Sequence, residues 1–230
     1  MSNPADVLPS VPGILAAVSG LGTAAYGLVD AFKAWGGGIS NAGFGHVRAA
    51  AERFLGDDVS AAFGRKDIVA TLRANWINGV DKADQKAKAK ALIRLGLTPA
   101  GAAQLADAAG VDAAELTACA ERISNGTGLT PQDLNILGRF DAVVSAVLDE
   151  GYERADQQYR NVAKFAAALV AVVLAAVGGA LIYSGADYLA SRDFGIAVLV
   201  GAVSTPLAPI AKDLSTALNA AVKAVSSVKR

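Results

Sequence analysis

The chain has 230 residues, of which 53% are hydrophobic, and its mean hydropathy is +0.38 with no net charge at pH 7. Soluble domains hold roughly 45–50% apolar residues even with glycine counted, so this composition favours a membrane protein. The lack of a positive surplus argues against a general nucleic-acid-binding protein, because such proteins need Lys and Arg to oppose the phosphates. The single cysteine, Cys119, excludes an intrachain disulfide and a multi-cysteine metal site.

Three uncharged stretches are long enough to be considered as membrane spans, for which about 20 apolar residues are needed. They cover residues 7–29, 165–186 and 194–211. Residues 1–6 contain neither Lys nor Arg, which argues against a cleaved signal peptide, so we expect the first stretch to be a retained helix. Lys164 and Asp187 bound the second stretch, the most apolar of the three, and a short loop over 187–193 leads to the third.

The distribution of Lys and Arg around these stretches predicts an orientation. Arg192 is the only basic residue in the loop between the second and third spans, whereas the tail after the third span carries several. Basic residues accumulate on the cytoplasmic side, so we expect the tail and residues 30–164 to be cytoplasmic and the amino terminus to lie outside. The expected location is therefore a bacterial inner membrane, with the lipid bilayer as a partner and no nucleic acid.

Residues 30–130 show helical patterns and enough polar residues to fold in water, which predicts a helical soluble domain. Thr98-Pro99 and Thr130-Pro131 each predict a helix start, because threonine caps a helix and proline suits its first position. After Pro131 the apolar residues recur at intervals of three and four, with no helix breaker before Phe165. This spacing predicts one helix of about 50 residues, in which residues 131–164 form a stalk that runs into the second span.

Two prolines, Pro206 and Pro209, predict a break in the third span. Ser204 and Thr205 precede them as capping residues precede a helix. We therefore expect the span to end or to kink sharply at this point and an amphipathic helix to follow over 206–230.

Two sets of residues are candidates for contact between helices or between copies of the chain. Small residues four apart let helix backbones approach closely, and the apolar stripe of the C-terminal helix must be covered. These residues are Gly13, Ala17, Gly20 and Ala24 in the first span and Leu214 and Leu218 in the C-terminal helix. The small residues can pack against the chain's own spans or against another copy. The stripe can be covered by the stalk, the inner leaflet or a neighbouring copy.

Four basic residues recur every four positions in the central region: Lys82, Lys86, Lys90 and Arg94. On a helix this spacing forms a basic ridge. One interpretation is a solvated face that nearby acids such as Asp84 partly neutralise. The other is contact with anionic lipid headgroups or an acidic partner, which a domain just beneath the inner leaflet can reach.

The sequence contains no motif that predicts catalysis. It has neither a G-x-x-x-x-G-K-[ST] phosphate loop nor a G-x-G-x-x-G turn after a strand, and its only histidine, His46, has no metal-ligand companion nearby. No nucleophile, base and orienting group can be assembled by spacing. The expected spans have no ionisable residue in their middle, which argues against transport by a single chain. We therefore expect no enzymatic activity, no cofactor and no metal.

The expected fold class is all-α: an integral membrane protein with about three transmembrane helices and a helical cytoplasmic domain. The paired apolar stretches "FAAALVAVVLAAVGGALIY" and "FGIAVLVGAVSTPLAP" follow that domain, and this arrangement resembles the hydrophobic hairpin of pore-forming colicins. The leading functional hypothesis is a non-enzymatic protein that self-associates into a scaffold or pore-like homo-oligomer. The alternative, which the resemblance implies, is a pore-forming effector that folds in water and then inserts into a membrane.

Overall fold

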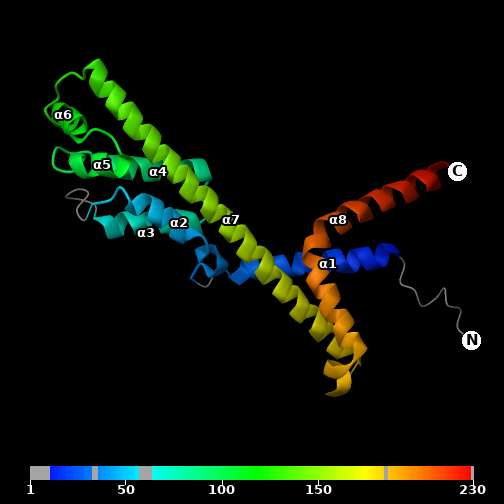
Figure 1. Cartoon of the computed structure of the whole chain (residues 1–230). Coiled ribbons are helices and arrows are strands. Elements are labelled where there is room, and N and C mark those ends of the chain that lie inside the picture. The colour runs from blue at the N-terminus through cyan, green and yellow to red at the C-terminus, as the bar shows by residue number, and fades with distance from the viewer. Residues whose placement is uncertain (1–10, 33–35, 57–63, 184–185, 229–230) are drawn as a thin grey trace, which may run out of the picture. The chain divides into compact units, whose positions relative to one another are not determined.

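The chain is almost entirely helical, which confirms the expected all-α class. The computed structural model describes residues 11–32, 36–56, 64–183 and 186–228, and this part of the chain contains no β-strand. Its α-helices are α1 (Val11–Ala31), α2 (Phe44–Glu52), α3 (Arg65–Ile77), α4 (Lys82–Arg94), α5 (Ala102–Ala109), α6 (Ala113–Ser124), α7 (Pro131–Tyr183) and α8 (Arg192–Val228) (Figure 1). Two short 3₁₀ helices are η3 (Gly38–Asn41) and η4 (Ala186–Ala190). Residues 1–6 and the start of the expected first span lie outside the described residues, as do the side chains at 11, 12, 186, 211, 212, 215, 218, 219 and 221–228.

The helices divide into two compact units. The first, called here the core unit, comprises Ser40–Arg160, and the second, the apolar unit, comprises Met1–Ile39 together with Asn161–Arg230. This division does not follow the expected boundary between a soluble domain and a stalk at residue 131. Residues 131–160 belong to the core unit, and their buried apolar side chains form one cluster with those of α2 to α6.

The first part of α7 is the central element of the core unit. Phe140, Val144, Leu148 and Tyr152 recur every four residues along it and are all buried. Side chains at this spacing lie on one face of a helix, so the row presents a continuous apolar surface to its neighbours. The segment that the sequence predicts as a stalk therefore organises the core of this unit up to Arg160.

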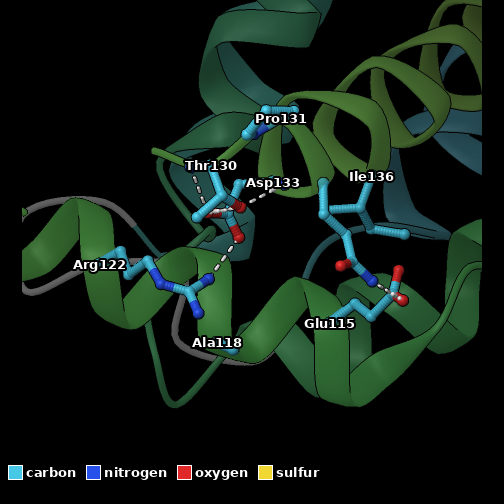
Figure 2. A pocket seen from close by; sticks show the side chains of 8 residues that line it. Glu115, Ala118, Arg122, Thr130, Pro131, Asp133 and Ile136 are labelled. Carbon is cyan, nitrogen blue, oxygen red and sulfur yellow. Dashed lines mark hydrogen bonds and ion pairs between the residues drawn. The ribbon is translucent and has the colours of Figure 1, made fainter. Parts of the chain in front are cut away.

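α7 begins at Pro131, where the Thr130-Pro131 pair predicts a helix start. The Thr130 hydroxyl accepts a hydrogen bond from the Asp133 backbone N–H at 3.2 Å, and the Asp133 carboxylate accepts one from the Thr130 backbone N–H at 2.8 Å. This reciprocal pairing satisfies two backbone donors that a helix start otherwise leaves without partners. The hydrogen bonds from Thr130 and the charge of Arg122, 2.5 Å from the carboxylate, hold the pKa of Asp133 below its usual value (Figure 2).

The other Thr-Pro pair produces a different local structure. Thr98 and Pro99 lie in a turn rather than in a helix, and α5 begins only at Ala102. The Thr98 hydroxyl accepts a hydrogen bond from the Gly101 backbone N–H at 3.1 Å, and the Thr98 carbonyl accepts one from the Ala102 N–H at 2.8 Å. The capping hydroxyl is used as expected, but it closes a turn that precedes the helix.

α8 is one helix that continues through Pro206 and Pro209. The third span therefore does not end at the prolines, and Figure 1 shows that the helix axis bends in its orange part. Ser204 does not cap a new helix, because its hydroxyl donates a hydrogen bond to the Gly201 carbonyl at 2.8 Å, within the same helix. A proline removes one regular helical hydrogen bond and crowds the preceding turn, and both effects bend a helix.

Candidate functional site

The last part of α7 exposes a row of large apolar side chains. They recur every four residues: Phe165, Leu169, Val173, Val177 and Leu181. Phe165 is 67% exposed and Leu181 78% exposed. Single exposed apolar residues are common on soluble proteins, but a continuous row of this length is typical of a surface that contacts lipid or protein.

α8 carries a second exposed apolar row. Its members, at intervals of three and four, are Ile196, Leu199, Val203, Leu207, Ile210 and Leu214. Leu214, a residue of the expected C-terminal stripe, is 45% exposed, and the side chain of Leu218 lies outside the described residues. The described part of the apolar unit therefore leaves this stripe open.

Within the described residues, three helices are long and apolar enough to cross a membrane. They are α1 over Gly13–Ala31, α7, whose apolar part begins at Phe165, and α8 over Arg192–Ile210. Only 17%, 11% and 22% of their most apolar windows, respectively, are buried inside the structure. The chain's own packing therefore covers little of the apolar surface that these helices carry.

Close helix contacts in the apolar unit occur at two glycines. A Cβ atom on Gly22 of α1 would lie 2.6 Å from the Ser204 carbonyl oxygen and 2.7 Å from the Ala208 Cβ atom of α8. A Cβ atom on Gly201 of α8 would lie 2.5 Å from the Val172 Cα atom of α7. These distances are shorter than van der Waals contact, so the helix backbones approach this closely only because both residues are glycine.

The small residues singled out in the sequence lie elsewhere on α1. Gly13, Ala17, Gly20 and Ala24 are all exposed, and a Cβ atom on Gly20 would meet nothing within 4 Å. The interpretation that this row packs against the chain's own spans is therefore wrong. Small residues occur on several faces of α1, so their spacing does not identify the face that contacts α8. The row stays open for contact with another copy.

Three aromatic residues, which the sequence analysis missed, pack around the connection between α7 and α8. Tyr188 in η4 is 5% exposed, stacks on Tyr183 with 6.1 Å between ring centroids, and meets the edge of Phe194 at 5.6 Å. A Cβ atom on Gly179 would lie 1.9 Å from the Tyr188 hydroxyl oxygen, so this glycine admits the ring. The sequence could have indicated this cluster, because three aromatic residues lie around one short connection in a chain with only 6% aromatic residues.

The basic ridge pairs with acids on α7. The closest contacts are Lys82 Nζ to Glu153 Oε1 at 3.0 Å, Lys86 Nζ to Asp149 Oδ1 at 2.6 Å, Lys90 Nζ to Asp141 Oδ2 at 3.3 Å, and Arg94 with Asp141. Residue numbers rise along α4 as those of the partners fall along α7, which is the pattern of two antiparallel helices. The hydrogen bond to Glu153 also raises the pKa of Lys82.

This ion-pair ladder gives the ridge partners that neither interpretation from the sequence included. The acids that pair with the ridge lie on α7 rather than on its own helix, and the four basic side chains remain partly exposed. The paired acids are 47 to 71 residues away in sequence, so no local pattern could indicate them.

The pocket drawn in Figure 2, about 480 Å³ in volume, lies at the start of α7. Its polar side chains pair with one another: Arg122 with Asp133, and Gln132 with Glu115 at 2.6 Å. Cys119 nearby is fully buried, and burial raises the pKa of its thiol, which makes it a poor nucleophile. Among the residues that the structure describes, no cluster of three or more His, Cys, Asp or Glu could hold a metal ion.

The fold and the exposed helices define an all-α protein with three helices capable of crossing a membrane. Comparison with protein-family models, with curated proteins and with solved structures finds no match for this chain. The residues and geometry of the apolar unit are therefore the features that indicate a function.

Gly20 and Gly22 form a matched pair of test positions on α1. Gly22→Leu should lower the melting temperature of the full-length protein in detergent, because its side chain would overlap α8. Gly20→Leu should leave the melting temperature nearly unchanged, since its side chain has space within the chain. It should reduce the size of any oligomer, because the added side chain would keep a second copy from approaching closely. Circular dichroism melting and mass photometry measure the two effects. Equal destabilisation by both variants would contradict this assignment of the faces of α1.

Lys86 and Asp149 offer a test of the ion-pair ladder. Lys86→Glu alone should lower stability, because it places two acids together, and adding Asp149→Lys should restore most of it. Exposed pairs contribute only about 0.2–1 kcal/mol, so the expected coupling is of this order. Urea unfolding in detergent measures it. Binding of the single and the double variant to anionic lipid vesicles is measured as well. If the double variant is not rescued and both variants lose vesicle binding, a role of the ridge in lipid contact is favoured instead.

Proposed function

We propose that this chain is a non-enzymatic integral membrane protein whose α1, α7 and α8 enter a lipid bilayer. The observation that carries this proposal is the pair of exposed apolar rows on α7 and α8. Fully burying a Leu, Val or Phe side chain contributes roughly 1.5–3 kcal/mol, so removing the two half-exposed rows from water is favourable by about 10 kcal/mol. Helices satisfy their own backbone polar groups, as insertion into lipid requires.

Self-association into a scaffold or pore-like homo-oligomer is the second part of the proposal. The exposed row Gly13, Ala17, Gly20 and Ala24 supports it, because small residues allow a second helix to approach closely in lipid. The open stripe of α8 offers another surface for a neighbouring copy.

The proposed orientation places the core unit in the cytoplasm, beneath a bacterial inner membrane. Its support is the distribution of basic residues: Arg192 alone marks the connection between α7 and α8, whereas Arg154, Arg160 and Lys164 precede the apolar part of α7.

A pore-forming effector is the alternative function. The core unit has a hydrophobic core of its own, including Phe140, Val144 and Leu148, and α7 and α8 flank a short connection as the helices of an insertable hairpin do. Such a protein would be purified from the soluble fraction and would insert later, whereas a resident membrane protein needs detergent from its synthesis onward.

Membrane extraction separates these two functions. We expect the expressed protein to stay in the membrane pellet through an alkaline carbonate wash and to be released by non-ionic detergent, because its apolar rows remain in lipid. Immunoblotting of the fractions measures this, with a soluble cytoplasmic protein as the control. Recovery of folded protein from the soluble fraction without detergent would support the effector instead.

The orientation is tested with single cysteines at two exposed positions, Lys88 and Leu189. The parent should be Cys119→Ala, because Cys119 is fully buried and a polar replacement would disturb the core. In spheroplasts, an impermeant maleimide should label Leu189→Cys at once and Lys88→Cys only after the membrane is permeabilised. The reverse pattern of labelling would refute the proposed topology.

A further inference from the structure

A pocket of about 530 Å³ lies within the apolar unit, among α1, α7 and the proline segment of α8. Its walls are mainly apolar and include Phe165, Pro206 and Pro209. Polar groups reach it from three helices: Tyr26 from α1, Lys164 from α7 and Thr205 from α8. An apolar pocket with a few convergent polar groups is the usual form of a small-ligand site.

Thr205 lines this pocket and carries a polar atom without a hydrogen-bond partner. Its residue is only 3% exposed, and its hydroxyl oxygen has no hydrogen-bond partner. A helical threonine commonly bonds to a carbonyl in the preceding turn, as the neighbouring Ser204 does to the Gly201 carbonyl, but the Thr205 hydroxyl makes no such bond. A buried hydroxyl without a partner is unfavourable, so a hydrogen-bonding group that enters beside Thr205 would be stabilised by it.

The two prolines add acceptors to the same place. Pro206 has no N–H to donate to the carbonyl of Ala202, and Pro209 has none to donate to the carbonyl of Thr205. Ala202 and Thr205 both line the pocket. The regular helical donors of two carbonyls are therefore missing beside the unpaired hydroxyl, which favours a ligand that carries hydrogen-bond donors.

Lys164 supplies a positive charge at the wall of this pocket. Among the described residues no carboxylate pairs with its ammonium, and it directly precedes the apolar part of α7, a position that the proposed insertion would place at a lipid headgroup. Lysine is a common ligand for phosphate groups. The phenol of Tyr26 lines the same pocket, and tyrosine suits this interfacial depth because its ring is apolar and its hydroxyl polar.

We propose that this pocket binds an anionic phospholipid whose headgroup carries hydroxyl groups, of the phosphatidylglycerol kind. Its phosphate pairs with Lys164, its glycerol hydroxyls donate to the carbonyls of Ala202 and Thr205, and the Thr205 hydroxyl bonds to the headgroup. The first carbons of its acyl chains contact Phe165 and the prolines. The proposal rests on the membrane insertion proposed above and is independent of self-association.

Native mass spectrometry of the delipidated full-length chain in detergent tests this site. The chain is titrated with phosphatidylglycerol, phosphatidylethanolamine and phosphatidylcholine of identical acyl chains. Phosphatidylglycerol should bind most tightly, because it combines a net negative charge with hydroxyl donors. Phosphatidylcholine should bind most weakly, since its headgroup has no donor. Equal binding of all three lipids would overturn the proposal.

Variants connect the binding to the pocket. Lys164→Gln and Thr205→Val should each weaken phosphatidylglycerol binding at least about fivefold, whereas Lys164→Arg should retain it. Arg192→Gln is the matched control, because Arg192 lies at the other end of the apolar segments and outside the pocket. Thr205→Val should not lower the melting temperature of the lipid-free protein, since its hydroxyl has no partner in the chain. Unchanged binding in both pocket variants would assign the lipid to another surface and overturn the proposal.

Three outcomes separate the alternatives. Displacement of phosphatidylglycerol by inorganic phosphate at equal concentration would identify a site for free phosphate and overturn the lipid assignment. A chain that stays soluble without detergent would contradict the proposed membrane insertion and this site together. A chain that needs detergent yet binds phosphatidylglycerol no better than phosphatidylcholine would contradict the site alone.

Discussion

α7 is hydrogen-bonded as one helix from Pro131 to Tyr183. The rest of the structure depends on how the environment of its apolar side chains differs between the two ends of this helix. Up to Arg160 its apolar row is buried by helices of the core unit, and from Phe165 its apolar row is exposed and charged residues are absent. A continuous helix satisfies its own backbone donors and acceptors, so it can pass from one environment to another without unpaired polar groups.

Charge and burial have separate roles in the core unit. The ion pairs between α4 and α7 are partly exposed, so each contributes only about 0.2–1 kcal/mol to stability. Ala89 and Ile93 of α4 are buried in the core, and their burial stabilises the packing of this helix independently of the ion pairs. The ladder specifies direction and register instead, since sliding α4 by one turn would leave a terminal cation or acid without its partner.

The apolar unit concentrates its polar atoms where α1 meets α8. Gly22 permits the close contact, Ser204 bonds within its own helix, and Thr205 beside it has no partner in the chain. The two prolines remove hydrogen bonds in the same segment. A bend in a helix that is surrounded by apolar residues thus produces a small polar site, and the proposed lipid headgroup supplies the groups that the helix lacks.

The sequence by itself determined the helical class, the three apolar helices and the start of α7, because each depends on local or periodic properties. Thr130 and Pro131 act within one turn of the helix that they start, and the charge-free apolar runs need no partner to be recognised. Even so, Thr98 and Pro99 form a turn before α5, and Ser204 bonds within α8 where the sequence predicts a cap. A Thr or Ser before proline can cap a new helix or form another local hydrogen bond, and contacts with the surrounding chain determine which of these occurs.

Only the tertiary structure decided which faces of these helices are used. Lys82 to Arg94 meet acids up to 71 residues away, and α1 contacts α8 through Gly22 rather than through the exposed Gly20. The pocket at Lys164 and Thr205 likewise joins residues from three helices. Sequence periodicity shows that side chains share a face of one helix, but the partner of that face depends on contacts between distant segments, which only the folded chain contains.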